Sequence, residues 1–214
     1  MNSGVNAMTD CPKTKIKICG LSRMEDIDYV NEALPDYIGF ITYKKSRRYV
    51  TPQKAAELKS RLDPRIRAAA VFVDEPAEFA ASYVQSGTAD IIQLHGHEDE
   101  EYIRSLRRLI PEGTPIIKAF LIKTEDDIKA AEKSSADYIL LDNGFGTGKT
   151  FSWDLLTESV SRPFFLAGGL DPDNIADAVA KFHPFAADIS SGVETDGVKD
   201  RQKIKDCVEC VRKC

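Results

Sequence analysis

Residues 16–42, IKICGLSRMEDIDYVNEALPDYIGFIT, contain the unit that decides the fold. A short apolar run, IKICG, is followed by SRMEDIDYVNEAL, whose apolar residues recur at helical spacing and whose Ser22 stands where an N-cap is expected. A second apolar run, DYIGFIT, comes next. Unbroken apolar runs are typical of parallel strands that are covered on both faces. The stretch therefore predicts a strand, a helix and a parallel strand.

The same unit recurs to the end of the chain, and Thr51 and Pro52 supply the cap and first position of the second helix. The further strand and helix pairs are 36–42 with 51–62, 67–73 with 75–87, 89–95 with 98–110, 115–122 with 124–135, 136–142 with 151–160, 163–169 with 171–182, and 186–192 with 200–213. Eight βα units without a linker predict one α/β domain, a single (β/α)8 TIM barrel over residues 15–214. An open doubly wound sheet is the alternative. Residues 1–14 are expected to form a flexible N-terminal extension.

Composition narrows the class of protein. The chain has 214 residues, of which 43% are hydrophobic, enough for a sizeable core. Its formal charge of −5 provides no general attraction for nucleic acid or an anionic membrane. No apolar run is long enough to span a membrane, and the N-terminus lacks the apolar core of a signal peptide. Five cysteines, an odd number, do not indicate a disulfide framework, so a cytoplasmic protein is expected. The oligomeric state is not determined, and a monomer is the working expectation.

Two groups of residues were considered as metal sites. Cys207, Cys210 and Cys214 can share one helix face, but zinc needs a fourth ligand and usually a loop, so a packed helix face is favoured. His95 and His97 form an H-x-H pair, yet His97 lies beyond a glycine, where we expect it to be exposed. No other residues complete either set convincingly, and we expect no metal.

The loop DNGFGTGKT at 142–150 resembles a nucleotide-binding P-loop because it follows a strand and contains Gly-Lys-Thr. A P-loop needs glycine five residues before Gly148, and Asn143 stands there, whereas Gly144 is one place too close. The spacing therefore excludes the usual phosphate cradle. We expect this loop to close over the barrel mouth as a lid.

In such a barrel the active site lies at the carboxyl ends of the strands. The last two of these ends, LAGGLDPDN (166–174) and DISSGVET (188–195), carry Gly168, Gly169 and Gly192. Glycine lets backbone amides approach an anion closely, and these positions are where many barrels bind phosphate. A tight turn is the alternative role. Two neighbouring glycine loops favour a phosphate site.

Cys19 and Asp142 end the first and sixth strands, on opposite walls of the mouth. A cysteine is often only a small core residue, but a modest downward shift of its pKa would supply a thiolate here. Asp142 could instead cap a helix or pair with Lys149; in a desolvated mouth its pKa would rise and it could donate a proton. One group that takes a proton and one that gives it suit an isomerase. Arg47 or Arg48 could hold an anionic group of the substrate.

Together these motifs resemble the phosphoribosylanthranilate isomerase family of tryptophan biosynthesis. The resemblance spans residue 15 to the C-terminus and rests on KICG (17–20), GF with SRRY (39–49), QLHG (93–96), GTGKTFSW (146–153), AGGL (167–170), DISSGVE (188–194) and GVKD (197–200). The sequence departs from the family pattern at Lys44, Phe145 and Ser152, none of which is a proposed catalytic residue.

The resemblance implies an Amadori rearrangement of N-(5-phosphoribosyl)anthranilate to 1-(2-carboxyphenylamino)-1-deoxyribulose 5-phosphate, without metal or cofactor. It implies Asp142 as the acid that opens the furanose ring to a Schiff base, and Cys19 as the base that takes the proton from ribose C2. Arg48 is expected to hold the anthranilate carboxylate. The other residues expected to bind substrate are His95, Gly146, Gly168, Gly169, Ser191 and Gly192.

Three rival functions remain. A related phosphosugar isomerase shared with histidine biosynthesis would have aspartate where Cys19 stands. A nucleotide switch is disfavoured by the glycine spacing. A barrel that only binds a phosphorylated ligand would not need both Cys19 and Asp142.

Overall fold

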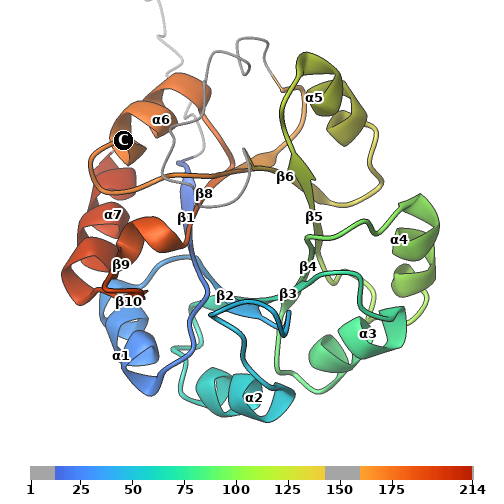
Figure 1. The fold of residues 1–214 in the computed structure, drawn as a ribbon, viewed down its shortest axis with the longest axis horizontal. Helices are drawn as coiled ribbons and strands as arrows, with labels where there is room; N and C mark the ends of the chain where they lie inside the picture. Colours follow the sequence, from blue (N-terminus) through green and yellow to red (C-terminus); the bar gives the residue numbers. More distant parts are fainter. Residues whose placement is uncertain (1–12, 143–159, 214) are drawn as a thin grey trace, which may run out of the picture.

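The computed structural model describes residues 13–142 and 160–213, and within them eight parallel strands form a closed barrel (Figure 1). Each strand pairs with its neighbours in sequence, and the first closes the ring against the last. The strands are β1 (Lys15–Cys19), β2 (Tyr37–Ile41), β3 (Arg67–Phe72), β4 (Ile91–Leu94), β5 (Ile116–Leu121), β6 (Tyr138–Asp142), β7 (Phe164–Ala167) and β8 (Ala186–Ile189). The predicted (β/α)8 TIM barrel is confirmed, and the open sheet is excluded.

Helices surround the barrel as an outer ring (Figure 1). They are α1 (Met24–Ala33), α2 (Pro52–Ser60), α3 (Ala77–Gln85), α4 (Glu100–Arg107), α5 (Glu125–Glu132), α6 (Ile175–Phe182) and α7 (Arg201–Lys213). The helix expected over 151–160 lies, apart from Val160, outside the described residues, as do residues 1–12 of the expected extension. Within the described ranges, no helix is long and apolar enough to cross a membrane.

The N-termini of α2 and α1 test two N-caps that were predicted from the sequence. Thr51 caps α2 as predicted, because its side chain accepts a hydrogen bond from the backbone N–H of Lys54 and Pro52 follows it. The Ser22 cap was wrong, since α1 begins at Met24. Asp26 reaches back instead, and its Oδ2 accepts from the backbone N–H of Ser22 at 2.9 Å.

A short hairpin between β8 and α7 was not expected from the sequence. A single 3-10 turn, η2 (Ser191–Val193), leads into β9 (Glu194–Thr195), which pairs antiparallel with β10 (Val198–Lys199). The hairpin places Glu194 and Lys199, both buried, beside the carboxyl ends of β1 and β8. It therefore adds two charged side chains to the end of the barrel where function was predicted.

The barrel interior consists of two layers that we name for use below. The basal layer fills the end nearer the strand starts, with residues that are apolar and buried: Tyr37, Ala69, Ile91, Ile117, Leu140, Phe165 and Ala186. Nearer the strand ends lies the mouth layer, a name that we use for Lys17 and Cys19 of β1 together with four residues that each stand two places after a basal residue: Gly39, Gln93, Asp142 and Asp188. Side chains alternate between the faces of a strand, so both layers point into the barrel. The basal layer closes the barrel, and the mouth layer is the floor of the candidate site.

Candidate active site

Cys19 lies at the end of β1, and its sulfur packs against a glycine of the next strand. It pairs in register with Gly39 of β2, and a Cβ added at Gly39 would lie 2.6 Å from Cys19 Sγ. The residue is only 7% exposed. Burial raises the pKa of the Cys19 thiol above its ordinary value, and the charge of Lys17 opposes the rise. The sequence suggested a downward shift; the direction is the reverse because the strand end is covered.

Lys17 and Asp188 form a buried ion pair directly below this cysteine. Lys17 Nζ lies 2.8 Å from Asp188 Oδ2, and Lys17 has no exposed surface. Asp188 Oδ1 is buried and has no hydrogen-bond partner among the described residues. Burial lowers the pKa of Lys17, but Asp188 and Cys19 raise it by more, so the ammonium stays charged. Neither residue was predicted from the sequence as a site residue.

Glu194 connects the loop after β2 to the β9–β10 hairpin. Arg48 contacts it with two nitrogens, Nε at 2.5 Å from Oε1 and Nη2 at 2.9 Å from Oε2. Arg47 Nη2 lies 2.5 Å from Oε2, and Lys199 Nζ lies 2.9 Å from Oε1. Burial raises the pKa of Glu194, but Arg48 and Lys199 lower it by more, and the net direction is downward. Both arginines therefore belong to one network, in which Arg48 is the less exposed.

Asp142, at the end of β6, faces His95 from the end of β4. His95 Nε2 lies 3.4 Å from Asp142 Oδ2, and the two side chains are 36% and 21% exposed. Gln93 Nε2 lies 3.1 Å from His95 Nδ1. Because an amide nitrogen only donates, Nδ1 is assigned as acceptor and the ring proton belongs on Nε2, towards Asp142. Gly146 lies outside the described residues, as does the rest of the expected lid.

The two glycine loops lie against each other, as the sequence predicted. A Cβ added at Gly192 would lie 1.9 Å from the carbonyl oxygen of Leu170, so only glycine permits this approach. Gly168 and Gly169 have φ of 95° and 69°, which favour glycine. Ser191 begins η2 and is exposed beside them. The pair of loops thus offers backbone amides at the edge of the mouth.

The residues considered as metal ligands have other structural roles. His97 is 95% exposed and its Nδ1 lies 3.0 Å from Asp74 Oδ2. Cys207 of α7 is buried and Cys210 is half-buried, which fits the packed helix face; Cys214 lies outside the described residues. In the described ranges, no group of three or more histidine, cysteine, aspartate or glutamate side chains could hold a metal ion.

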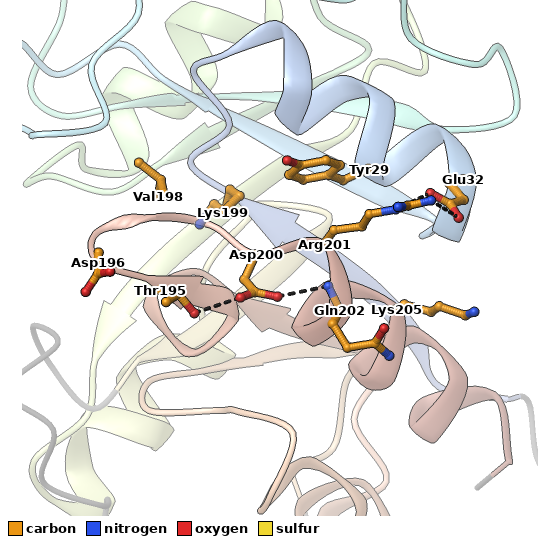
Figure 2. Close-up of a pocket in the computed structure, with 10 residues that line it drawn as sticks. All are labelled: Tyr29, Glu32, Thr195, Asp196, Val198, Lys199, Asp200, Arg201, Gln202 and Lys205. Atoms are coloured by element: carbon orange, nitrogen blue, oxygen red, sulfur yellow. Dashed lines mark hydrogen bonds and ion pairs between the residues drawn. The ribbon is translucent and has the colours of Figure 1, made fainter.

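A separate cavity of about 630 Å³ lies between α1, the β9–β10 hairpin and the start of α7 (Figure 2). Its polar groups bond to each other: Arg201 holds Glu32 at 2.7 and 2.8 Å, and Thr195 donates to Asp200 at 2.7 Å. Lys199 also lines it, but its ammonium turns to Glu194 and to the carbonyl oxygen of Ser190. None of the residues predicted to act in catalysis lines this cavity, so the candidate site is the barrel mouth.

Comparison with known proteins gives one family. Residues 16–210 match the family described as N-(5'phosphoribosyl)anthranilate (PRA) isomerase. The chain is 45% identical over 203 residues to the N-(5'-phosphoribosyl)anthranilate isomerase of Endomicrobium trichonymphae, covering 92% of this chain and 98% of the relative.

Two solved structures are also similar. One is a phosphoribosyl anthranilate isomerase in complex with reduced 1-(o-carboxyphenylamino)-1-deoxyribulose 5-phosphate, with 35% identity, a TM-score of 0.79 and coverage of 94% of this chain and 100% of that chain. The other contains mutually generated monomers of the dimeric enzyme from Thermotoga maritima, with 36% identity, a TM-score of 0.80 and the same coverage.

Proposed function

The chain belongs to the phosphoribosylanthranilate isomerase family, and we propose that Cys19 and Asp142 are the base and the acid of its reaction. The enzyme converts N-(5-phosphoribosyl)anthranilate to 1-(2-carboxyphenylamino)-1-deoxyribulose 5-phosphate in tryptophan biosynthesis. The observation that supports the assignment is their placement. Both residues face the mouth from β1 and β6, with β7 and β8 between them, so a sugar can lie between the two groups.

The two groups act in sequence. Asp142 donates a proton to the furanose ring oxygen, the C1–O bond breaks, and the open chain is a protonated Schiff base. Cys19, as thiolate, takes the proton from ribose C2, and the electron pair of that bond moves to form an enolamine. Tautomerisation then gives the aminoketone. His95 faces Asp142 with Nε2 and orients its carboxyl group towards the substrate.

The charged ends of the substrate match the two sides of the mouth. Glu194 occupies the Nε and one Nη2 hydrogen of Arg48, so the remaining guanidinium hydrogens are available to the anthranilate carboxylate. The amides of Gly168, Gly169, Ser191 and Gly192 are proposed to bind the phosphate. Gly146 is proposed to contact substrate from the loop after β6.

Further parts of the assignment concern the molecule as a whole. We propose that residues 1–14 are an extension without a catalytic role, and that the enzyme works in the cytoplasm without nucleic acid or membrane. All proposed site residues come from one chain, so a monomer is sufficient. The relative from Thermotoga maritima is described as dimeric, and monomers of it were generated. The chemistry above uses no metal or cofactor, so EDTA should leave the rate unchanged.

The test is the loss of phosphoribosylanthranilate fluorescence with parent, Cys19→Ser and Asp142→Asn proteins. Each substitution should lower turnover about 100-fold or more, the usual contribution of a general acid or base. Cys210→Ser on α7 and Asp126→Asn on α5 are matched controls far from the mouth and should keep parental turnover. Parental turnover in Cys19→Ser or Asp142→Asn would refute that residue's role, and an inactive parent would refute the whole assignment.

A further inference from the structure

Lys17 is a charged side chain in a place where burial is costly. It is 0% exposed inside the barrel, and an ammonium there needs compensating partners. Its ammonium donates to Asp188 Oδ2 at 2.8 Å and also lies within hydrogen-bonding reach of the Cys19 side chain. A pair this deep is often no more stable than an apolar substitute, so fold stability alone does not explain it.

The sulfur and this ammonium pack against the same glycine. The same added Cβ that would lie 2.6 Å from Cys19 Sγ would lie 3.2 Å from Lys17 Nζ. The thiol and the ammonium therefore both occupy the space beside Gly39. Because both come from inward positions of β1, the backbone of a single strand fixes their separation.

Four further charged side chains lie near Cys19 on other elements. Asp188 approaches from β8 and opposes a thiolate, whereas Lys199 of β10 favours one. Arg48 packs against Gly20, the residue after Cys19, with its Cδ 2.4 Å from an added Cβ there. The Glu194 carboxylate accepts hydrogen bonds from two nitrogens of Arg48 and from the Lys199 ammonium. Lys17 has the largest single charge effect on Cys19, and it favours the thiolate.

We infer that Lys17 is a positioning residue for the reaction, whose ammonium stabilises the Cys19 thiolate that removes the ribose proton, while Asp188 keeps that ammonium charged. The inference rests on the proposed role of Cys19. Lys17 does not touch the substrate in this scheme; it acts through the sulfur. In its absence the pKa of the buried thiol, which already lies above its ordinary value, would rise further, and less of the thiolate base would be present.

The experiment measures Cys19 itself and does not depend on turnover. Methyl methanethiosulfonate modifies thiolates, and mass spectrometry of peptides gives the rate at each cysteine from pH 6 to 10. In Lys17→Met the pH at which Cys19 reacts should rise by about one unit or more, so that its rate at pH 7 falls about tenfold. Cys210 is an internal reference and should not change. The acidic limb of the kcat/KM profile should move with the Cys19 reaction.

Lys118→Met is the matched control. Lys118 is also a buried strand lysine, 5% exposed, with Nζ 2.9 Å from Glu98 Oε2, but it lies on β5. Its loss should leave the Cys19 reaction unchanged. If Lys17→Met does not fold, Lys17→Met with Asp188→Asn removes the unpaired carboxylate. The pH at which Cys19 reacts should still rise in this variant, but by less, because Asp188 no longer opposes the thiolate. If folded Lys17→Met shows the parental pH dependence of the Cys19 modification rate, the inference is overturned. Full turnover in Cys19→Ser would instead overturn the proposed role of Cys19 as the base.

Discussion

The basal layer and the mouth layer are supplied by the same strands, yet their residues differ in kind. In the basal layer Phe165 packs against Tyr37 and Tyr138 with ring centroids 5.7 and 5.6 Å apart. In the mouth layer, nearer the strand ends, Lys17 and Asp188 are charged, and Gly39 lets the Cys19 sulfur approach the backbone closely. One layer is packed with apolar side chains, and the other contains charges and a position too tight for a Cβ.

The difference shows how one barrel separates stability from chemistry. Close-packed apolar side chains stabilise the fold in proportion to the area they bury. Buried charges contribute little to stability or reduce it, so their place in the mouth layer points to function. The comparison predicts that substitutions in the basal layer mainly lower stability, and that substitutions in the mouth layer mainly lower turnover.

Phe165→Ala should give the largest effect and should act on stability. Phe165 is 1% exposed and is in contact with three other rings of the barrel interior. Removing a buried phenylalanine side chain costs about 3–5 kcal/mol of unfolding free energy. Urea unfolding measures that loss, and turnover of the folded variant at 20 °C should stay within about threefold of the parent. Phe182→Ala, half-buried on α6 outside the barrel, should cost less. A large loss of turnover in folded Phe165→Ala would break the comparison.

Gly39→Ala tests the mouth layer with a single methyl group. The added Cβ would lie 2.6 Å from Cys19 Sγ, so the sulfur must move. Displacing a reacting group by about 1 Å can cost about 100-fold in rate, equivalent to about 2.7 kcal/mol. Steady-state kinetics should show this in kcat. Ala186→Val overfills the basal layer instead and should lower stability by about 1–3 kcal/mol with little change in kcat. Parental kcat in Gly39→Ala would show that the close packing of the Cys19 sulfur against Gly39 is not needed for the reaction.

The two layers also differ in how well the sequence predicts them. Short unbroken apolar runs predicted the eight strands, because strands covered on both faces carry little else. The strand ends then located Cys19 and Asp142, and the barrel rule placed them at one mouth. The adjacent glycine loops followed from the same rule. Features that depend on local pattern or on topology were therefore predictable.

Features that depend on pairing across the barrel were not predictable. Lys17 is one charged residue in an apolar run, and its partner Asp188 is 171 positions away. Arg48 and Glu194 are separated by 146 positions. The β9–β10 hairpin has strands of two residues, too short for any periodic signal. The upward direction of the Cys19 pKa depends on burial, which the strand pattern alone does not give.

Glu194→Gln should lower the free energy of unfolding by about 2 kcal/mol at pH 7. This is the usual cost of losing a hydrogen bond to a charged group. The pKa of Glu194 in the folded protein lies below its ordinary value of 4.5, so its contribution is complete above that pH and is lost as the pH falls through the folded pKa. Urea unfolding of parent and variant should therefore differ at pH 7 and converge towards acid. KM should also rise, since Glu194 orients Arg48.

Glu32→Gln is the matched control for this carboxylate. Arg201 also contacts Glu32 with two nitrogens, at 2.7 and 2.8 Å, but both side chains are exposed. Water screens such a pair, so its loss should change stability less than the loss of Glu194. If Glu194→Gln and Glu32→Gln lower the free energy of unfolding equally, burial does not strengthen the ion pair between Glu194 and Arg48.

Thr51→Ala should give the smallest effect, because Thr51 belongs to neither layer. Its hydroxyl oxygen accepts from the backbone N–H of Lys54 at 3.1 Å at the start of α2. Losing an N-cap costs about 1 kcal/mol, which urea unfolding can detect, and Thr51→Ser should restore the loss.

Turnover and KM should not change in Thr51→Ala, although Arg48 is only three residues away. The loop is anchored independently of the cap, since the backbone N–H of Val50 donates to the carbonyl oxygen of Ile41 at 2.9 Å and Arg48 is held by Glu194. A raised KM in Thr51→Ala would show that these anchors are insufficient. The Thr51 cap at the start of α2 would then help to position Arg48 for the substrate carboxylate. In that case α2 would contribute to both stability and catalysis.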